Sequence, residues 1–139
     1  MNKKDKAIKK FYTTSNCAQA VVTSFAEELQ MDEIVLNKIA SGFGAGMGKL
    51  QKTCGALTGG VMVIGLKKEG KLDKNQVYEL VQNFESKFKE INQNTDCRQL
   101  LNCDLNTEEG QKYFNENNLK DSVCTNCVKN SIAILEKLI

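Results

Sequence analysis

The chain has 139 residues, of which 41% are hydrophobic and 26% charged, so it can bury the core of one soluble globular domain and should not be disordered. Its 19 basic and 17 acidic residues leave a net charge of +2, far from the basic excess of nucleic-acid-binding proteins. Histidine is absent, which excludes Ser-His and Cys-His nucleophile pairs, histidine-containing zinc sites and histidine-ligated haem.

Proline is also absent, and no run of alternating β-branched residues indicates a strand. We therefore expect an all-α fold, in which residues 1–139 form a single-domain helical bundle of about five to seven helices. Residues 1–10 carry five lysines with no apolar segment behind them, so we predict no secretory signal peptide and a cytoplasmic location. The longest apolar stretch, Ala56–Leu66, has eleven residues, whereas a membrane span needs about 20. We expect no direct membrane insertion.

The helices can be placed from their apolar spacing and from capping residues such as Asn16, Asp32, Thr53, Asp73 and Thr107. We predict helices over residues 3–12, 17–30, 33–40, 54–68, 74–91, 107–117 and 122–139, with a brief helical turn at 97–101. The 54–68 helix is the most apolar and is expected to be the buried central helix. In the last helix Val128, Ile132, Leu135 and Ile139 form a narrow seam that suits core packing or, as an alternative, a homodimer.

A glycine-rich loop, Gly42–Gly48, precedes the predicted central helix. It does not match a dinucleotide-binding fingerprint, which would need glycine where Met47 stands. A Walker loop would need glycine in place of Phe43 and serine or threonine in place of Leu50. We therefore expect the glycines to provide a tight turn and close backbone packing beside the cysteines, with a cofactor contact as the alternative.

Six cysteines are the main candidates for chemistry: Cys17, Cys54, Cys97, Cys103, Cys124 and Cys127. In a reducing compartment they are interpreted first as metal ligands or redox thiols. Cys17, Cys54, Cys97 and Cys124 each fall in the first turn of a predicted helix, where the helix dipole stabilises a thiolate. If these four ends converge, they can bind metal as a Cys₄ site or exchange electrons as disulfides. The alternative for any one of them is a small buried core residue.

Cys124 and Cys127 form a CxxC that places both sulfurs on one helix face. Together with Cys97 and Cys103 it could make a four-thiolate zinc site, although five residues separate Cys97 from Cys103 and structural zinc sites usually have two to four. A thioredoxin-like motif is excluded because no βαβ pattern surrounds this CxxC.

The sequence resembles the C_GCAxxG_C_C family of redox-active proteins over nearly its whole length. Residues 54–59, Cys-Gly-Ala-Leu-Thr-Gly, match the family's CGAxxG motif, and residues 16–21 resemble its first cysteine segment. Gly42–Gly48 resembles the glycine-rich approach to the motif, and the segments at Cys97 and Cys124 resemble the third and fourth cysteine segments.

The resemblance implies a helical domain of this length with four functional thiols, Cys17, Cys54, Cys97 and Cys124. Cys103 and Cys127 are additions to the pattern, as an extra disulfide or as alternate ligands. Gly55 and Gly59 are expected to let the helix start and a neighbour approach closely, beside any cofactor. The resemblance also implies a redox role, a redox partner protein, and an association with a transporter system.

Three functions remain open. The first is electron transfer, with an iron–sulfur cluster ligated by Cys17, Cys54, Cys97 and Cys124, since thiolates are the ligands such clusters require. The second is a metal-free thiol–disulfide redox protein with Cys54 and Cys17 as the reactive pair. The third is a non-enzymatic module, with a Cys₄ zinc site or only buried cysteines, that serves a transporter or larger complex.

Overall fold

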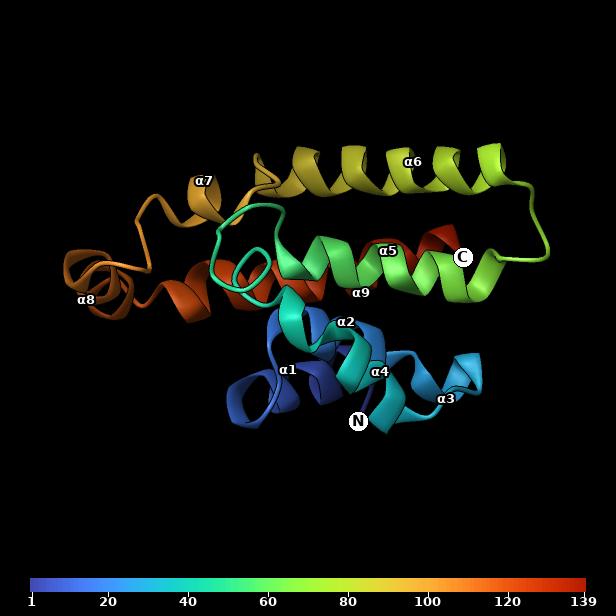
Figure 1. Cartoon of the computed structure of the whole chain (residues 1–139), viewed down its shortest axis with the longest axis horizontal. Helices are drawn as coiled ribbons and strands as arrows, with labels where there is room; N and C mark the ends of the chain where they lie inside the picture. The colour runs from blue at the N-terminus through green and yellow to red at the C-terminus, as the bar shows by residue number, and fades with distance from the viewer.

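A computed structural model describes all 139 residues and contains helices and loops but no β-sheet (Figure 1). The α-helices are α1 (Lys3–Thr13), α2 (Cys17–Ser24), α3 (Ala26–Leu29), α4 (Glu33–Ala40), α5 (Gly55–Lys68), α6 (Lys74–Asn92), α7 (Cys97–Leu101), α8 (Glu108–Glu116) and α9 (Thr125–Leu138). A 3₁₀ turn, η1 (Ser41–Phe43), and a π-helical turn, η2 (Lys120–Cys124), complete the order. The predicted all-α class is confirmed.

Capping side chains set most of the helix starts. Asn16 and Asp73 each form a capping box with the glutamine three residues later, Asp32 accepts a hydrogen bond from the backbone of α4, and Thr107 accepts one from the backbone of α8. These side chains satisfy backbone N–H groups that a helix start leaves without a partner. The predicted starts of α2, α4, α6 and α8 therefore hold, because capping is a local interaction.

The helix predicted over residues 17–30 is two helices in the structure, which contributes to a total of nine rather than five to seven. The chain leaves α2 at Phe25, whose backbone departs from helical geometry and whose side chain is buried in the core. Burial of this aromatic ring at the junction is a tertiary effect that residue spacing does not report.

The apolar helix α5 lies at the centre of the bundle. In Figure 1, α6 runs along one side of α5 and α9, and α1, α2 and α4 lie on the other side. Gly60 lets the Phe84 ring of α6 pack directly on the α5 backbone, and the Ser131 hydroxyl of α9 donates a buried 2.8 Å hydrogen bond to the Ala56 carbonyl. The prediction of a buried central helix after a glycine-rich loop is confirmed.

The apolar seam of α9 is used inside the chain. Val128, Ile132 and Leu135 are fully buried, and α9 packs against α1, α5 and α6. Of the two uses predicted for this seam, core packing is therefore the one observed, and these three side chains are not available as a dimer face.

At one end of the bundle α7 and α8 form a small separate cluster (Figure 1). It contains buried Cys97, Leu101 and Cys103, with partly buried side chains from α8 and η2 packed around them. This cluster meets the amino end of α5 and closes the space described below.

Candidate functional site: a cavity lined by five thiols

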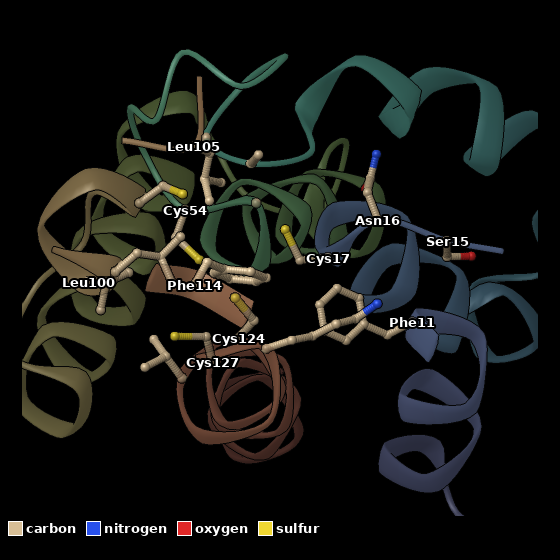
Figure 2. A pocket seen from close by; sticks show the side chains of 17 residues that line it. Phe11, Ser15, Asn16, Cys17, Cys54, Leu100, Leu105, Phe114, Cys124 and Cys127 are labelled. Carbon is tan, nitrogen blue, oxygen red and sulfur yellow. The ribbon is translucent and has the colours of Figure 1, made fainter. Parts of the chain in front are cut away.

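Five of the six cysteines line a single cavity of about 280 Å³ at the amino end of α5 (Figure 2). They are Cys17, Cys54, Cys97, Cys124 and Cys127. The rest of the wall is mainly apolar and includes Phe11, Leu100, Leu101, Leu105, Phe114 and Val123. The structure thus brings together the four cysteines selected from the sequence, from four separate chain segments, and adds Cys127 to them.

Cys17 is the first residue of α2 and lies between the capping residue Asn16 and the glycine-rich loop. Asn16 caps the helix and also donates a 3.1 Å hydrogen bond to the Ser41 carbonyl, which ties this helix end to the glycine-rich loop. The backbone N–H groups of Ala18 and Ala45 act to lower the pKa of Cys17. The loop predicted to pack beside the cysteines lines the same cavity through Ala45 and Gly46.

Cys54 caps α5, one residue later than predicted, since the helix begins at Gly55 and Thr53 lies outside it. The Cys54 N–H donates to the Thr95 carbonyl at 2.8 Å. The Cys54 side chain makes no capping hydrogen bond, so its sulfur is free to point into the cavity.

Gly55 and Gly59 explain how α2 can lie so close to α5. A Cβ atom at Gly55 would stand 2.3 Å from the Cys17 sulfur, and one at Gly59 would stand 2.7 Å from the Ala18 carbonyl oxygen. Such contacts are closer than van der Waals packing allows, so only glycine fits. Gly55 lines the cavity but Gly59 does not, so Gly59 acts through helix packing rather than by contact with a bound group.

Cys97 begins α7 and is placed by a short antiparallel pairing with the segment before α5. The Cys97 N–H donates to the Lys52 carbonyl at 2.7 Å, next to the Cys54 bond to Thr95. These two bonds fix Cys54 and Cys97 relative to each other although they are far apart in the chain.

Gln51 was not identified from the sequence, yet it organises this side of the cavity. Its buried side-chain amide donates to the Cys103 carbonyl at 2.9 Å and to the Cys97 sulfur at 3.9 Å, and its Oε1 accepts from the Leu105 N–H at 2.8 Å. Gln51 has a left-handed backbone, φ +55°, in a loop with several positive-φ residues. No local sequence signal marks a glutamine for this role.

Cys124 and Cys127 enter from the last helical segment. The prediction that Cys124 lies in the first turn of a capped helix is wrong in detail: it ends the π-helical turn η2, which begins at Lys120 without a side-chain cap and continues into α9. Cys127 lies three residues further on and is 2% exposed. Both line the cavity, as the CxxC spacing on one helix face predicts.

Lys120 is the only charged side chain on the cavity wall, and it was likewise not singled out from the sequence. Its Nζ lies 4.7 Å from the centre of the Phe11 ring and 5.1 Å from that of Tyr12, within the range of cation–π contacts. The Tyr12 hydroxyl contacts Thr125 Oγ1 at 2.9 Å and donates to the Asp121 carboxylate. This group of contacts attaches α1 to η2 at the cavity rim.

The thiols influence one another in two ways. Hydrogen bonding with Cys17 and with Cys127 shifts the pKa of Cys54, whereas Cys17 acts on the pKa values of Cys97 and Cys124 through charge alone. No three cysteine or carboxylate side chains are close enough together to hold a single metal ion. The four-thiolate zinc site considered for Cys97, Cys103, Cys124 and Cys127 is therefore not assembled.

Cys103 lies outside the cavity. Its side chain is buried in the small cluster beside Leu101, and on its outer side lies a shallow surface pocket with Arg98 and Asp104. Of the two cysteines that add to the four-cysteine pattern, only Cys127 belongs to the site.

Burial and mutual contact keep these thiols protonated. The pKa of Cys17 is raised well above its usual value by the hydrogen bond to Cys54 and by burial, and the pKa of Cys54 is raised by its bond to Cys127 and by burial. Burial also raises the pKa of Cys97 to about 11 and that of Cys124 to about 12. The expectation that helix ends favour thiolates here is wrong, because their N–H groups offset only part of the cost of a buried charge.

No helix of the chain combines the length and apolar character that crossing a membrane requires. Comparison with curated proteins and with solved structures gives no significant match. Among family models, the one described as "Putative redox-active protein (C_GCAxxG_C_C)" matches residues 15–138. That range contains all six cysteines and every helix except α1. A match over this share of the sequence shows that the chain belongs to the C_GCAxxG_C_C family.

Proposed function

We propose that this redox-active protein works by thiol–disulfide exchange, with Cys17 and Cys54 as its dithiol. The observation that carries the proposal is the placement of these two cysteines: a Cβ at Gly55, the residue after Cys54, would lie 2.3 Å from the Cys17 sulfur, and both cysteines line the cavity. A pair in contact can close to a disulfide by side-chain movement, whereas thiols further apart need the backbone to shift.

The reaction begins at Cys17, because its residue is half-buried while Cys54 is buried. The Cys17 thiolate attacks a disulfide of a small molecule or partner protein, forming a mixed disulfide and releasing one thiolate. The Cys54 thiolate then attacks the Cys17 sulfur and releases the second thiolate, leaving a Cys17–Cys54 disulfide. Two electrons pass from the dithiol to the substrate disulfide, and the two protons of the cysteines pass to the released thiolates.

The raised pKa values of the cavity thiols favour a protein that reduces disulfide substrates over one that oxidises thiols. A dithiol becomes strongly oxidising when its surroundings stabilise the thiolate of the reduced form, as in oxidases with very low cysteine pKa values. Here the pKa values of both Cys17 and Cys54 are raised, so the reduced form gains no such stabilisation. We expect a reduction potential at or below that of thioredoxin, about −270 mV.

Oxidation with glutathione disulfide tests the proposal. The reduced wild-type protein should lose two thiols and carry a Cys17–Cys54 link in non-reducing peptide maps. Cys54→Ser should stop at a glutathione adduct on Cys17, because no resolving thiol remains. Cys103→Ser is the matched control, since Cys103 is buried but lies outside the cavity, and it should behave as wild type. A wild-type protein that keeps all six thiols under these conditions would contradict the proposal.

A second candidate function is electron transfer through an iron–sulfur cluster held by Cys17, Cys54, Cys97 and Cys124. The observation that favours it is that these four thiols surround one largely apolar space from four chain segments, and that the Gln51 amide donates to the Cys97 sulfur. Thiolate ligands and hydrogen bonds to sulfur are what such clusters use. A bound cluster would supply one-electron transfer.

Anaerobic purification and reconstitution with iron and sulfide distinguish this candidate. If it is correct, the wild-type protein binds iron and acid-labile sulfide in stoichiometric amounts and turns brown. Cys97→Ser should lose most of this iron and colour, whereas Cys103→Ser should keep both. Stoichiometric zinc without iron, or a colourless protein after reconstitution, would rule the cluster out.

A further inference from the structure

Cys127 is the one thiol of the cavity that the four-cysteine pattern leaves without a role. It lies in the first turn of α9, is 2% exposed, lines the same cavity as Cys54 and belongs with Cys54 to one buried core cluster. Cys17 and Cys127 are the two thiols that act on the pKa of Cys54 by hydrogen bonding, and of these Cys17 is half-buried and Cys127 buried.

Simple core packing does not account for this contact. A buried cysteine commonly serves as a small apolar side chain, and Cys103 is such a case, since no thiol hydrogen bonds to it. Cys127 differs because its side chain faces the cavity and meets the one cysteine that the proposed function makes reactive. Figure 2 shows Cys127 and Cys17 among the side chains that line one cavity, from different helices.

We propose that Cys127 is a second disulfide partner of Cys54 and that it exchanges with Cys17. The inference rests on the proposed dithiol function. Starting from the Cys17–Cys54 disulfide, the Cys127 thiolate attacks the Cys54 sulfur. The Cys54–Cys127 bond forms, the Cys17–Cys54 bond breaks, and the proton lost by Cys127 is gained by the Cys17 thiolate. The step is an isomerisation that changes no oxidation state overall and needs no further oxidant.

The exchange gives the oxidised protein two forms, which differ in how accessible the disulfide is to solvent. In the outer form the disulfide includes half-buried Cys17, and in the inner form both sulfurs belong to buried residues. In the inner form the disulfide is buried. External thiols must reach a sulfur in order to attack it, so they react slowly with this form. It also returns Cys17 to the free thiol, so that Cys17 is again available to a substrate disulfide. Reduction of the inner form runs through the same exchange in reverse.

Peptide mapping of the oxidised wild-type protein is the first test. After oxidation with glutathione disulfide and acid quenching at successive times, Cys17–Cys54 should appear first. Cys54–Cys127 should then grow as Cys17–Cys54 declines, with the number of free thiols constant at four during the exchange. No Cys17–Cys127 link should form, since Cys54 is the shared partner in the proposed exchange.

Two variants isolate the partners. Cys17→Ser removes the outer partner, and prolonged oxidation should give Cys54–Cys127 with the loss of two thiols, more slowly than in wild type because the buried thiols must react directly. Cys127→Ala should give Cys17–Cys54 alone, and Cys103→Ser should give both links as wild type does. Circular dichroism and thermal unfolding of each variant check that it is folded.

The outcomes separate the two claims. A Cys17–Cys54 link in wild type, with no Cys54–Cys127 link either there or in folded Cys17→Ser, would overturn the exchange and leave the proposed dithiol intact. A wild-type protein that forms no link at all would overturn the dithiol function, and the exchange with it. Because the wild-type time course needs no variant, a variant that does not fold leaves the test complete.

Discussion

At the scale of single residues, the cavity puts thiols where ionisation is costly. Cys54 is in contact with two other thiols, and Cys97 and Cys124 are surrounded mainly by apolar side chains. Lys120 lowers the pKa of Cys124, but burial outweighs this effect. These cysteines are therefore protonated thiols in the reduced protein. They lose their protons when they take part in thiol–disulfide exchange or bind a positively charged group.

Alkylation should report these pKa values directly. Iodoacetamide reacts with the thiolate, so the metal-free native protein should react at pH 8 more than about tenfold slower than the same protein in denaturant. The rate for Cys97 should rise as the pH approaches its pKa of about 11. Mass spectrometry of timed samples measures the rate at each cysteine. Native rates equal to denatured rates at pH 8 would contradict the raised pKa values.

The same shift links stability to pH. Since the pKa of Cys97 is higher in the folded chain than the usual 9.0, the unfolded chain loses this proton first as the pH rises. The free energy of unfolding should be unaffected below about pH 8 and should fall above about pH 9, by up to about 1.4 kcal/mol per pH unit for this thiol. Urea unfolding of the reduced protein from pH 7 to 10.5 measures it, with Cys97→Ser expected to show a smaller slope.

At the scale of helices, the site depends on the close approach of α2 to α5. The two helices touch through backbone at Gly55 and Gly59, and this contact is what places the Cys17 sulfur beside the start of α5. A capped start of α2 and the backbone pairing of residues 52–54 with 95–97 hold the other components in register. The thiols are thus positioned by rigid helix ends rather than by mobile loops.

Adding one methyl group at this contact should disturb the site. Gly55→Ala places a Cβ where the Cys17 sulfur lies, so we expect a loss of about 1–3 kcal/mol in stability and slower formation of the Cys17–Cys54 link. Gly65→Ala is the matched control in the same helix: nothing lies within 4 Å of its Cβ position, and it should stabilise by about 0.5–1 kcal/mol. Urea unfolding and peptide mapping give both values. Equal effects of the two substitutions would contradict the assigned role of Gly55.

At the scale of the whole molecule, either disulfide would join segments that are distant in the chain. Cys17 lies in α2, Cys54 begins α5 and Cys127 lies in α9, so a link between two of them restricts the unfolded chain strongly. The buried hydroxyl of Ser131 and the packed ring of Phe84 already hold these helices together in the reduced protein.

Oxidation should therefore raise stability. We expect the oxidised wild-type protein to be more stable than the reduced form by about 2–4 kcal/mol. Cys54→Ser, which removes the common partner and forms no internal disulfide, should show no such gain in stability on oxidation. Guanidinium unfolding with and without dithiothreitol measures the difference, and an oxidised protein no more stable than the reduced one would argue against a disulfide that fits the native fold.

Much of the fold could be predicted because its determinants are local. Asp73 with Gln76 starts α6, and Asn16 with Gln19 starts α2, through hydrogen bonds between residues three apart. The division of the 17–30 segment at Phe25 could not be predicted, because it follows from burial of the ring against distant parts of the chain.

The sequence by itself determined the helical class, most helix boundaries and the four cysteines worth examining, because capping, periodicity and motif spacing act over a few residues. Only the tertiary structure decided that Cys127 belongs to the site and Cys103 does not, that Gln51 holds Cys97, and that the thiols are protonated. Those properties depend on which distant segments meet and how much water they exclude. Neither the contacts between distant segments nor the exclusion of water can be inferred from the residues that are adjacent in the chain.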